Sequence, residues 1–225
     1  MEITAAPLVI VDGDLGSLVA LACASDESVS LGSGRATGPC ALAWQPPNFG
    51  TTTHERANAC ERQASLFNAR LLPRSPADDS LRHQRDVGQA GPVMTQTLFG
   101  SLDHAHELGS SRVIWPTHPG RLGDDTSIDL SLASTIMDRA LLVEQLAKLD
   151  ATSGQERICI ETPHADLSDR QLVEIATDLA VPIKTLWWWG SSVDDEAVQE
   201  RERWEPLMQE TGLWRTADRR AVAGR

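Results

Sequence analysis

The chain has 225 residues, of which 41% are hydrophobic and 23% are charged, so it can bury a sizeable core and is not a disordered polymer. Its 32 acidic and 20 basic residues give a formal net charge of -12. Because such a surface repels phosphate backbones, we expect no direct nucleic-acid binding. No stretch approaches the roughly 20 apolar residues of a membrane span, and the start of the chain lacks the basic segment and long apolar run of a signal peptide. We therefore expect a cytoplasmic protein that does not engage a membrane.

Short apolar runs alternate along the chain with segments of helical periodicity. The predicted strands are Leu8–Val11, Cys40–Trp44, Ala69–Leu72, Arg112–Trp115 and Arg157–Ile160. The predicted helices are Leu15–Ala24, Glu55–Asn68, a helix through Leu98, Leu102 and Ala105 that ends at Gly109, Ile136–Leu149, a helix opened by Ser168, and Val193–Gln209. Two segments predict no regular structure: a Gly/Ser-rich connector at Gly32–Gly38, and a mobile loop at Pro73–Gly91, which is polar and has no periodicity.

The helix opened by Ser168 has the strongest local signals. Ser168 and Gln171 have the spacing of a capping box, and the following apolar residues fall on one helical stripe. Val181-Pro182 ends the helix, because proline disfavours helical backbone in the residue before it.

Strands that alternate with helices predict an α/β fold: a Rossmann-like, parallel, five-stranded sheet with helices on both faces. We expect one such domain over residues 1–190, with an acidic helical segment at 191–225 packed on it. Ligands of such sheets bind at the carboxyl ends of the strands, beside the first turn.

The four cysteines are widely separated and lie in apolar segments, a pattern typical of buried free thiols in a reducing compartment. They are Cys23, Cys40, Cys60 and Cys159.

The first turn, Asp12-Gly13-Asp14-Leu15-Gly16-Ser17, has the form of a nucleotide-binding turn. A buried strand, a glycine turn and a helix start together direct backbone N–H groups toward a phosphate. Here Asp12 and Asp14 stand where the phosphate would lie, and two such charges about 4 Å apart repel by several kcal/mol at an effective dielectric near 20. The turn therefore predicts a pocket from which phosphate is disfavoured.

This turn resembles that of the PP-loop ATP pyrophosphatases, of the adenine nucleotide alpha hydrolase-like fold, whose pattern is SGGxDS. Gly13 and Ser17 match it, whereas Asp12, Asp14 and Gly16 depart from it. The stretch Ile160–Pro182 is similar to TPLxxLSKxEIVxLGxxLGVP of the 7-cyano-7-deazaguanine synthases, which make the nitrile precursor of queuosine from 7-carboxy-7-deazaguanine, ammonia and ATP. The resemblance runs along nearly the whole chain and implies a PP-loop-like fold, a purine-like ligand and a homo-oligomer.

Two other parts of that family's machinery are missing from the sequence. No cysteine follows Cys159, so the family's thiolate zinc site cannot form, and we expect no bound zinc. Pro92-Val93-Met94-Thr95 stands where the family has an Arg-Asn pair that provides a cation for phosphate. Together with the acidic turn, these departures predict a degenerate member of the family that lacks ATP-dependent nitrile formation and binds a small ligand or a partner through the old pocket.

Two alternatives stay open. One is an active enzyme of the synthase type, in which the acidic turn recruits Mg²⁺ or an adenine nucleotide to act on a purine-like substrate. The other is a structural subunit of an oligomer. The residues assigned to the nucleotide or ligand pocket are Asp12, Gly13, Asp14, Gly16, Ser17, His118, Asp124 and Asp125.

Three consecutive tryptophans, Trp187, Trp188 and Trp189, occupy the place of the zinc lobe. Adjacent residues of an extended segment cannot all face one side. We expect at least one of them to pack inside the domain against Val193–Gln209 and at least one other to contact a second subunit; stacking on a purine-like base is the alternative.

Overall fold

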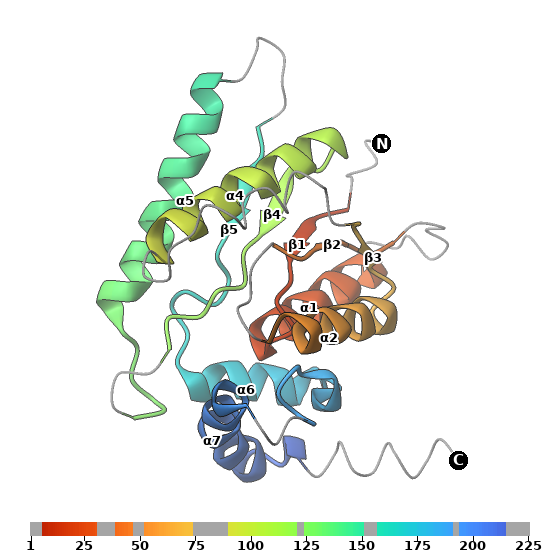
Figure 1. Ribbon diagram of the computed structural model, residues 1–225, viewed down its shortest axis with the longest axis vertical. Helices are drawn as coiled ribbons and strands as arrows, with labels where there is room; N and C mark the ends of the chain where they lie inside the picture. Colours follow the sequence, from red (N-terminus) through yellow and green to blue (C-terminus); the bar gives the residue numbers. More distant parts are fainter. Residues whose placement is uncertain are drawn as a thin grey trace.

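The structure, a computed structural model, describes residues 6–30, 39–46, 52–73, 90–120, 124–150, 157–190 and 194–214. Five strands form one parallel sheet in the order β3-β2-β1-β4-β5 (Figure 1). The strands are β1 (Leu8–Ile10), β2 (Leu42–Trp44), β3 (Arg70–Leu71), β4 (Arg112–Ile114) and β5 (Cys159–Glu161). The helices are α1 (Leu15–Ser30), α2 (Thr53–Leu66), α4 (Ala90–Glu107), α5 (Leu130–Asp150), α6 (Asp169–Asp178), the 3-10 helix η3 (Ile183–Thr185) and α7 (Asp195–Glu210). The predicted α/β class with a five-stranded parallel sheet is confirmed.

Helices cover both faces of the sheet, and the central strand shows why. Successive side chains of a strand point to opposite faces. Leu8 and Ile10 pack with the apolar stripes of α4 and α5, whereas Val9 and Val11 pack with those of α1 and α2. Figure 1 shows these two helix pairs on either side of the sheet. A strand buried on both faces has a continuous apolar sequence, which is how β1 was predicted.

The loops that follow β1 and β4 leave the sheet at the same edge. These strands are neighbours and run parallel, with Leu8 opposite Val113 and Val9 opposite Ile114. The turn after β1 and the segment after β4 therefore meet beyond the carboxyl ends of the strands.

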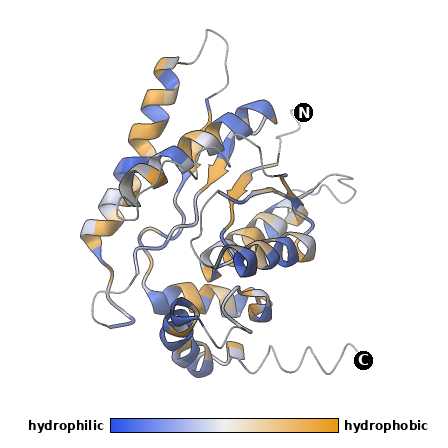
Figure 2. Ribbon diagram, in the orientation of Figure 1, coloured by the Kyte–Doolittle hydropathy of each residue, from blue (hydrophilic) through white to orange (hydrophobic). Residues whose placement is uncertain are grey.

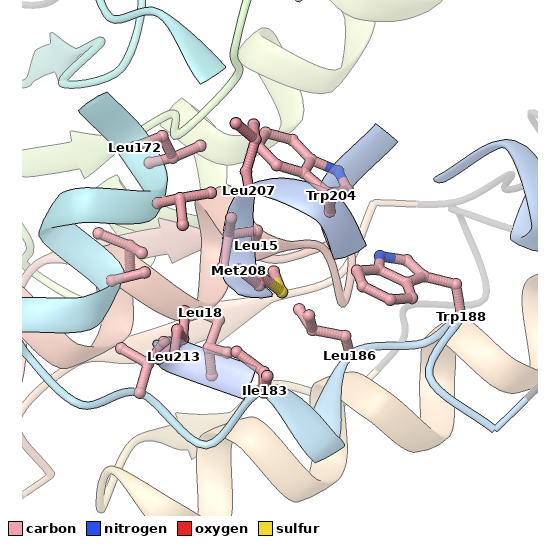
Figure 3. Packing of buried hydrophobic residues seen from close by; sticks show 14 of the residues in the cluster. Leu15, Leu18, Leu172, Ile183, Leu186, Trp188, Trp204, Leu207, Met208 and Leu213 are labelled. Carbon is pink, nitrogen blue, oxygen red and sulfur yellow. The ribbon is translucent and has the colours of Figure 1, made fainter. Parts of the chain in front are cut away.

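The C-terminal third of the chain forms an apolar cluster of its own against α1. Figure 3 shows side chains from α1, α6, η3, the tryptophan run and α7 converging in this cluster. The capping box of α6 is confirmed: the Ser168 side chain accepts from the Gln171 backbone N–H, and the Gln171 side chain accepts from the Ser168 backbone N–H. The labelled members of the cluster are Leu15, Leu18, Leu172, Ile183, Leu186, Trp188, Trp204, Leu207, Met208 and Leu213.

Some predicted boundaries, and the predicted burial of all four cysteines, are wrong. The segment Pro73–Gly91 was predicted as a loop, but Ala90 and Gly91 already belong to α4, while residues 74–89 and the connector Gly32–Gly38 lie outside the described residues. The cysteines are free, but only Cys40 and Cys60 are buried: Cys23 is half-buried, and Cys159 is exposed on β5 at the edge of the sheet. No helix in the described part of the chain is long and apolar enough to cross a membrane.

Candidate functional site

The turn between β1 and α1 is held in a fixed shape by hydrogen bonds within the turn. The Asp14 backbone N–H donates to Asp12 Oδ1 over 2.9 Å, and the Leu18 backbone N–H donates to the Asp14 carbonyl over 3.1 Å, which starts α1. Gly13 has a φ of 84°, which favours glycine, and a Cβ there would lie 2.9 Å from Ala59 Cβ. The conformation of the turn thus depends on a glycine at its centre.

Arg56 braces this turn from α2. Its Nη1 donates to Asp14 Oδ2 over 3.0 Å and to the Asp12 carbonyl over 3.3 Å, and its Nη2 donates to Glu196 Oε1 of α7 over 2.6 Å. The guanidinium also lies 4.0 Å from the ring centroid of Trp187. Only 8% of the Arg56 side chain is exposed, so the first turn, α2 and α7 are joined by a buried cation.

Both carboxylate oxygens of Asp14 are therefore engaged by the protein, since Trp187 Nε1 donates to Oδ1. Burial and the negative charge of Asp12, which Arg56 and Trp187 offset only in part, raise the pKa of Asp14 to about 7. The predicted repulsion between Asp12 and Asp14 thus raises the pKa of Asp14. The prediction did not include Arg56, whose positive charge partly compensates this repulsion.

A pocket of about 130 Å³ opens beside this turn at the carboxyl edge of the sheet. Its walls come from the first turn, from the segment that follows β4, from α6 and from α7. The lining residues are Asp12, Asp14, Leu15, Gly16, Pro116, Thr117, His118, Leu172, Glu200, Arg203 and Trp204.

His118 and Arg203 form the polar side of the pocket opposite the turn. Arg203 donates to both oxygens of Asp169 over 2.8 and 2.5 Å, and Asp169 is fully buried at the start of α6. His118 Nδ1 lies 3.1 Å from Arg203 Nη2 and accepts from the Gly120 backbone N–H. Because arginine only donates, Nδ1 is the acceptor and the ring proton is assigned to Nε2.

The His118 ring is neutral at pH 7. Burial lowers its pKa to about 4, and the charge of Arg203 acts in the same direction against the opposing Asp169 carboxylate. His118 Nε2 is buried and makes no hydrogen bond within the described ranges of the chain. The ring is therefore a neutral, fixed group of the pocket wall.

Glu200 adds a third carboxylate to the pocket. Its Oε2 accepts from Trp204 Nε1 over 2.7 Å, and burial followed by the negative charge of Asp14 raises its pKa. Three carboxyl groups thus line the pocket with one arginine, Arg203, which is already paired with Asp169, while Arg56 outside the lining compensates part of the charge of Asp14. The lining carries an excess of negative charge.

Gly16 lines the pocket where the backbone that follows β4 passes directly beside it. A Cβ on Gly16 would lie 2.5 Å from the Pro116 carbonyl oxygen and 3.6 Å from the His164 ring. The His164 Nε2 atom also lies 3.2 Å from the Gly16 carbonyl. No side chain can be added here without moving the segment after β4.

The three consecutive tryptophans differ in burial and in the groups that they contact. Trp188 is fully buried in the C-terminal cluster, and its carbonyl accepts from Arg201 of α7 over 3.0 Å. Trp187 is buried against Arg56. Trp189 is half-buried, with its ring centroid 4.3 Å from that of Trp214. The expectation that at least one tryptophan packs inside the domain with α7 is confirmed.

The other predicted site residues lie away from the pocket lining. Ser17 is buried and donates to the Asp14 carbonyl over 3.0 Å, so it helps to shape the turn. Asp124 is exposed, and hydrogen bonds from the side chains of Ser127 and Thr126, together with those from their backbone N–H groups, lower its pKa. Asp125 lies 2.6 Å from Arg170 of α6. The structure thus brings Asp12, Asp14, Gly16 and His118 together and places Asp124 and Asp125 in a separate turn.

Sequence reasoning missed Arg56, Glu200 and Arg203. Arg56 follows His54-Glu55 in a helix whose polar residues have the pattern of a solvated face. Glu200 and Arg203 are three positions apart in a strongly charged helix, so nothing in the local sequence separates them from its exposed charges. Among the residues that the structure describes, no group of three or more His, Cys, Asp or Glu side chains has an arrangement that could hold a metal ion.

A comparison of the sequence with models of known protein families gave no match, and a comparison with curated protein sequences gave none either.

Proposed function

We propose that this chain is a degenerate PP-loop-like protein, similar to the 7-cyano-7-deazaguanine synthases, that lacks ATP-dependent nitrile formation and binds a small, non-phosphorylated ligand in the pocket beside the first turn. One observation carries the proposal. The Asp14 carboxyl group, held by Arg56 and Trp187, occupies the turn in which a nucleotide-binding protein would receive a phosphate.

The charge of the lining supports exclusion of phosphate. Asp12, Asp14 and Glu200 face the pocket, and the one lining arginine is engaged by a buried carboxylate. A triphosphate would meet negative charge that Arg56 compensates only in part, in a partly desolvated site where such repulsion is stronger than in water. A neutral heterocycle or a small ammonium ion meets no such repulsion and can donate to the carboxylate oxygens.

The size of the pocket supports the same conclusion. Pockets for drug-sized ligands measure roughly 300 to 1,000 Å³, whereas this one measures about 130 Å³. The small pocket thus favours a free, purine-like base or a short amine over a nucleotide. The ligand class that we favour is thus a small, neutral or cationic, nitrogen-rich molecule.

A thermal-shift and calorimetric panel tests the proposal. We expect no binding of ATP, AMP or pyrophosphate at 1 mM, with or without Mg²⁺, and we expect binding of 7-deazaguanine or methylammonium. Glu200→Gln removes one lining carboxylate and should weaken that binding at least about tenfold, a loss of about 1.4 kcal/mol. Glu202→Gln is the matched control on the same helix, since Glu202 is exposed and outside the pocket lining.

Two results would contradict the proposal. One is release of pyrophosphate that depends on 7-carboxy-7-deazaguanine. The other is a ligand whose affinity is the same in wild type and Glu200→Gln. A second variant should gain binding: Asp12→Ser with Asp14→Gly removes both carboxylates of the turn and should strengthen ATP binding. Gly16 must be kept in that variant, because an aspartate there would collide with the segment after β4.

A further inference from the structure

Two walls of the pocket beside the first turn each carry a carboxylate oxygen that has no donor within the described part of the chain. Asp12 Oδ1 accepts from the Asp14 backbone N–H, and Glu200 Oε2 accepts from Trp204 Nε1. Asp12 Oδ2 and Glu200 Oε1 accept no hydrogen bond from any residue that the structure describes. We call these two atoms the open acceptors. One belongs to the turn after β1 and the other to α7, so a ligand between these walls meets an acceptor on each side.

The two arginines next to the open acceptors are already committed to other carboxylates. Arg56 donates to Asp14 and to Glu196, and Arg203 donates to both oxygens of the fully buried Asp169. The pocket therefore keeps an excess of negative charge. A small cation neutralises that excess and supplies the donors that the open acceptors lack.

Helix α7 supplies charge to the pocket as well as apolar cover. Figure 2 shows that this helix is hydrophilic over most of its length, and Figure 1 places it beside α6. Its apolar residues Leu207 and Met208 pack in the C-terminal cluster, whereas Glu200 and Arg203 line the pocket together with Trp204. The wall that α7 forms is thus suited to a polar ligand with a flat, partly aromatic contact.

The chain's own cations in this region are planar groups that lie over aromatic rings. The Arg56 guanidinium lies 4.0 Å from the ring centroid of Trp187, and the Arg203 guanidinium lies 4.3 Å from that of Trp204. Each of them also donates along its edge to a carboxylate. The N–H groups of an amidinium or a guanidinium diverge within one plane, so such a cation can donate to a carboxylate on each of two walls.

We infer that the pocket takes a small, planar monocation of the amidinium or guanidinium class, held between Asp12 of the first turn and Glu200 of α7, and that its binding displaces a proton from Asp14. The inference rests on the proposed function. It narrows the ligand from neutral or cationic molecules to this one class, and it makes the binding depend on pH.

The displaced proton is the one that Asp14 holds near neutral pH. Burial and the negative charge of Asp12 raise the pKa of this carboxyl group to about 7. A bound cation favours the ionised form, so the proton passes to the buffer and the affinity rises with pH. His118 stays neutral over this range, because its pKa is lowered to about 4. The charged groups around Asp14, from its own turn, α2, α6 and α7, are Asp12, Arg56, Asp169, Glu196, Glu200 and Arg203.

Calorimetry of the full chain with three matched probes tests the ligand class. At pH 8, methylguanidinium should bind at least about tenfold more tightly than methylurea, which has nearly the same shape but no charge. It should also bind at least about tenfold more tightly than methylammonium, which has the charge without the planar donors. Between pH 6 and pH 8 the affinity for methylguanidinium should rise about tenfold. Because a proton is released, the measured heat near pH 7 should differ between phosphate and HEPES buffers.

Two variants assign the contacts. Glu200→Gln removes one wall's carboxylate and should weaken methylguanidinium binding at least about tenfold. Asp14→Asn removes the titrating group, so the pH dependence and the proton release should both disappear. Glu202→Gln, on the exposed side of the same helix and outside the lining, should bind as the wild type does. Circular dichroism of each variant establishes that a loss of binding is not a loss of fold.

The outcomes separate this inference from the proposed function. Methylurea or methylammonium that binds as tightly as methylguanidinium would overturn the ligand class. Binding without proton release, or proton release that survives Asp14→Asn, would overturn the role of Asp14. If 7-deazaguanine or methylammonium binds in a way that depends on Glu200 and methylguanidinium does not, the inference fails and the proposed function stands. If none of these probes binds, both fail.

Discussion

Replacing Asp14 by asparagine should stabilise the protein above neutral pH. The pKa of Asp14 is raised from 3.8 to about 7, so the folded state binds more protons than the unfolded state between these values. Stability therefore falls as the pH rises through this window, because ionisation of Asp14 is harder in the folded state. Asparagine keeps an oxygen that can accept from Trp187 or Arg56 and carries no charge.

The expected change in the free energy of unfolding follows from the pKa shift of Asp14. About three pKa units correspond to roughly 4 kcal/mol at 1.36 kcal/mol per unit. Because 30% of the Asp14 side chain is exposed, solvent screens part of this energy, and we expect about 2 kcal/mol. Asp14→Asn should thus be about 2 kcal/mol more stable than wild type at pH 8 and less than about 1 kcal/mol more stable at pH 5.

Urea unfolding followed by tryptophan fluorescence at several pH values measures this difference. His118 contributes an opposite slope, since its pKa is lowered from 6.5 to about 4 and stability rises with pH across that range. This contribution is present in both proteins and cancels to first order in the comparison. Asp26→Asn, at an exposed position of the same helix, is the control. A pH-independent difference, or a variant less stable than wild type at pH 8, would refute the reasoning.

Three further outcomes are expected. Gly16→Ala places a Cβ 2.5 Å from a backbone oxygen and should cost about 1 to 3 kcal/mol in urea unfolding, whereas Gly190→Ala, with no atom within 4 Å, should cost less than about 1 kcal/mol. Arg203→Met leaves the fully buried carboxylate of Asp169 without its partner and should cost about 3 to 5 kcal/mol; Asp169→Asn in that background should recover part of the loss, and no recovery would contradict a charge effect. Residues 165–225 contain neither cysteine nor histidine, so elemental analysis should find no stoichiometric zinc and a chelator should leave the Tm unchanged.

The sequence by itself determined the fold class and the location of the first turn. The central strand β1 is a short apolar run because it is buried on both faces, and the helix after Ser168 begins with a capping box, so local sequence carries enough information for both. The sequence also placed Asp12 and Asp14 in the turn after β1, since a strand–turn–helix unit is contiguous. It did not predict that α5 begins at Leu130 rather than at Ile136.

Only the tertiary structure decided which groups face the turn. Arg56 is 42 positions from Asp14, and Trp187 is 173 positions away, so no local pattern encodes either contact. A charged residue of an amphipathic helix has the same sequence signature whether it faces solvent or pairs with a distant carboxylate, because periodicity reports the apolar side of the helix and not the partner of the polar side. The compensation of the acidic turn, and the small volume left beside it, result from how α2 and α7 meet at Arg56 and from how α7 packs on α1 and α6.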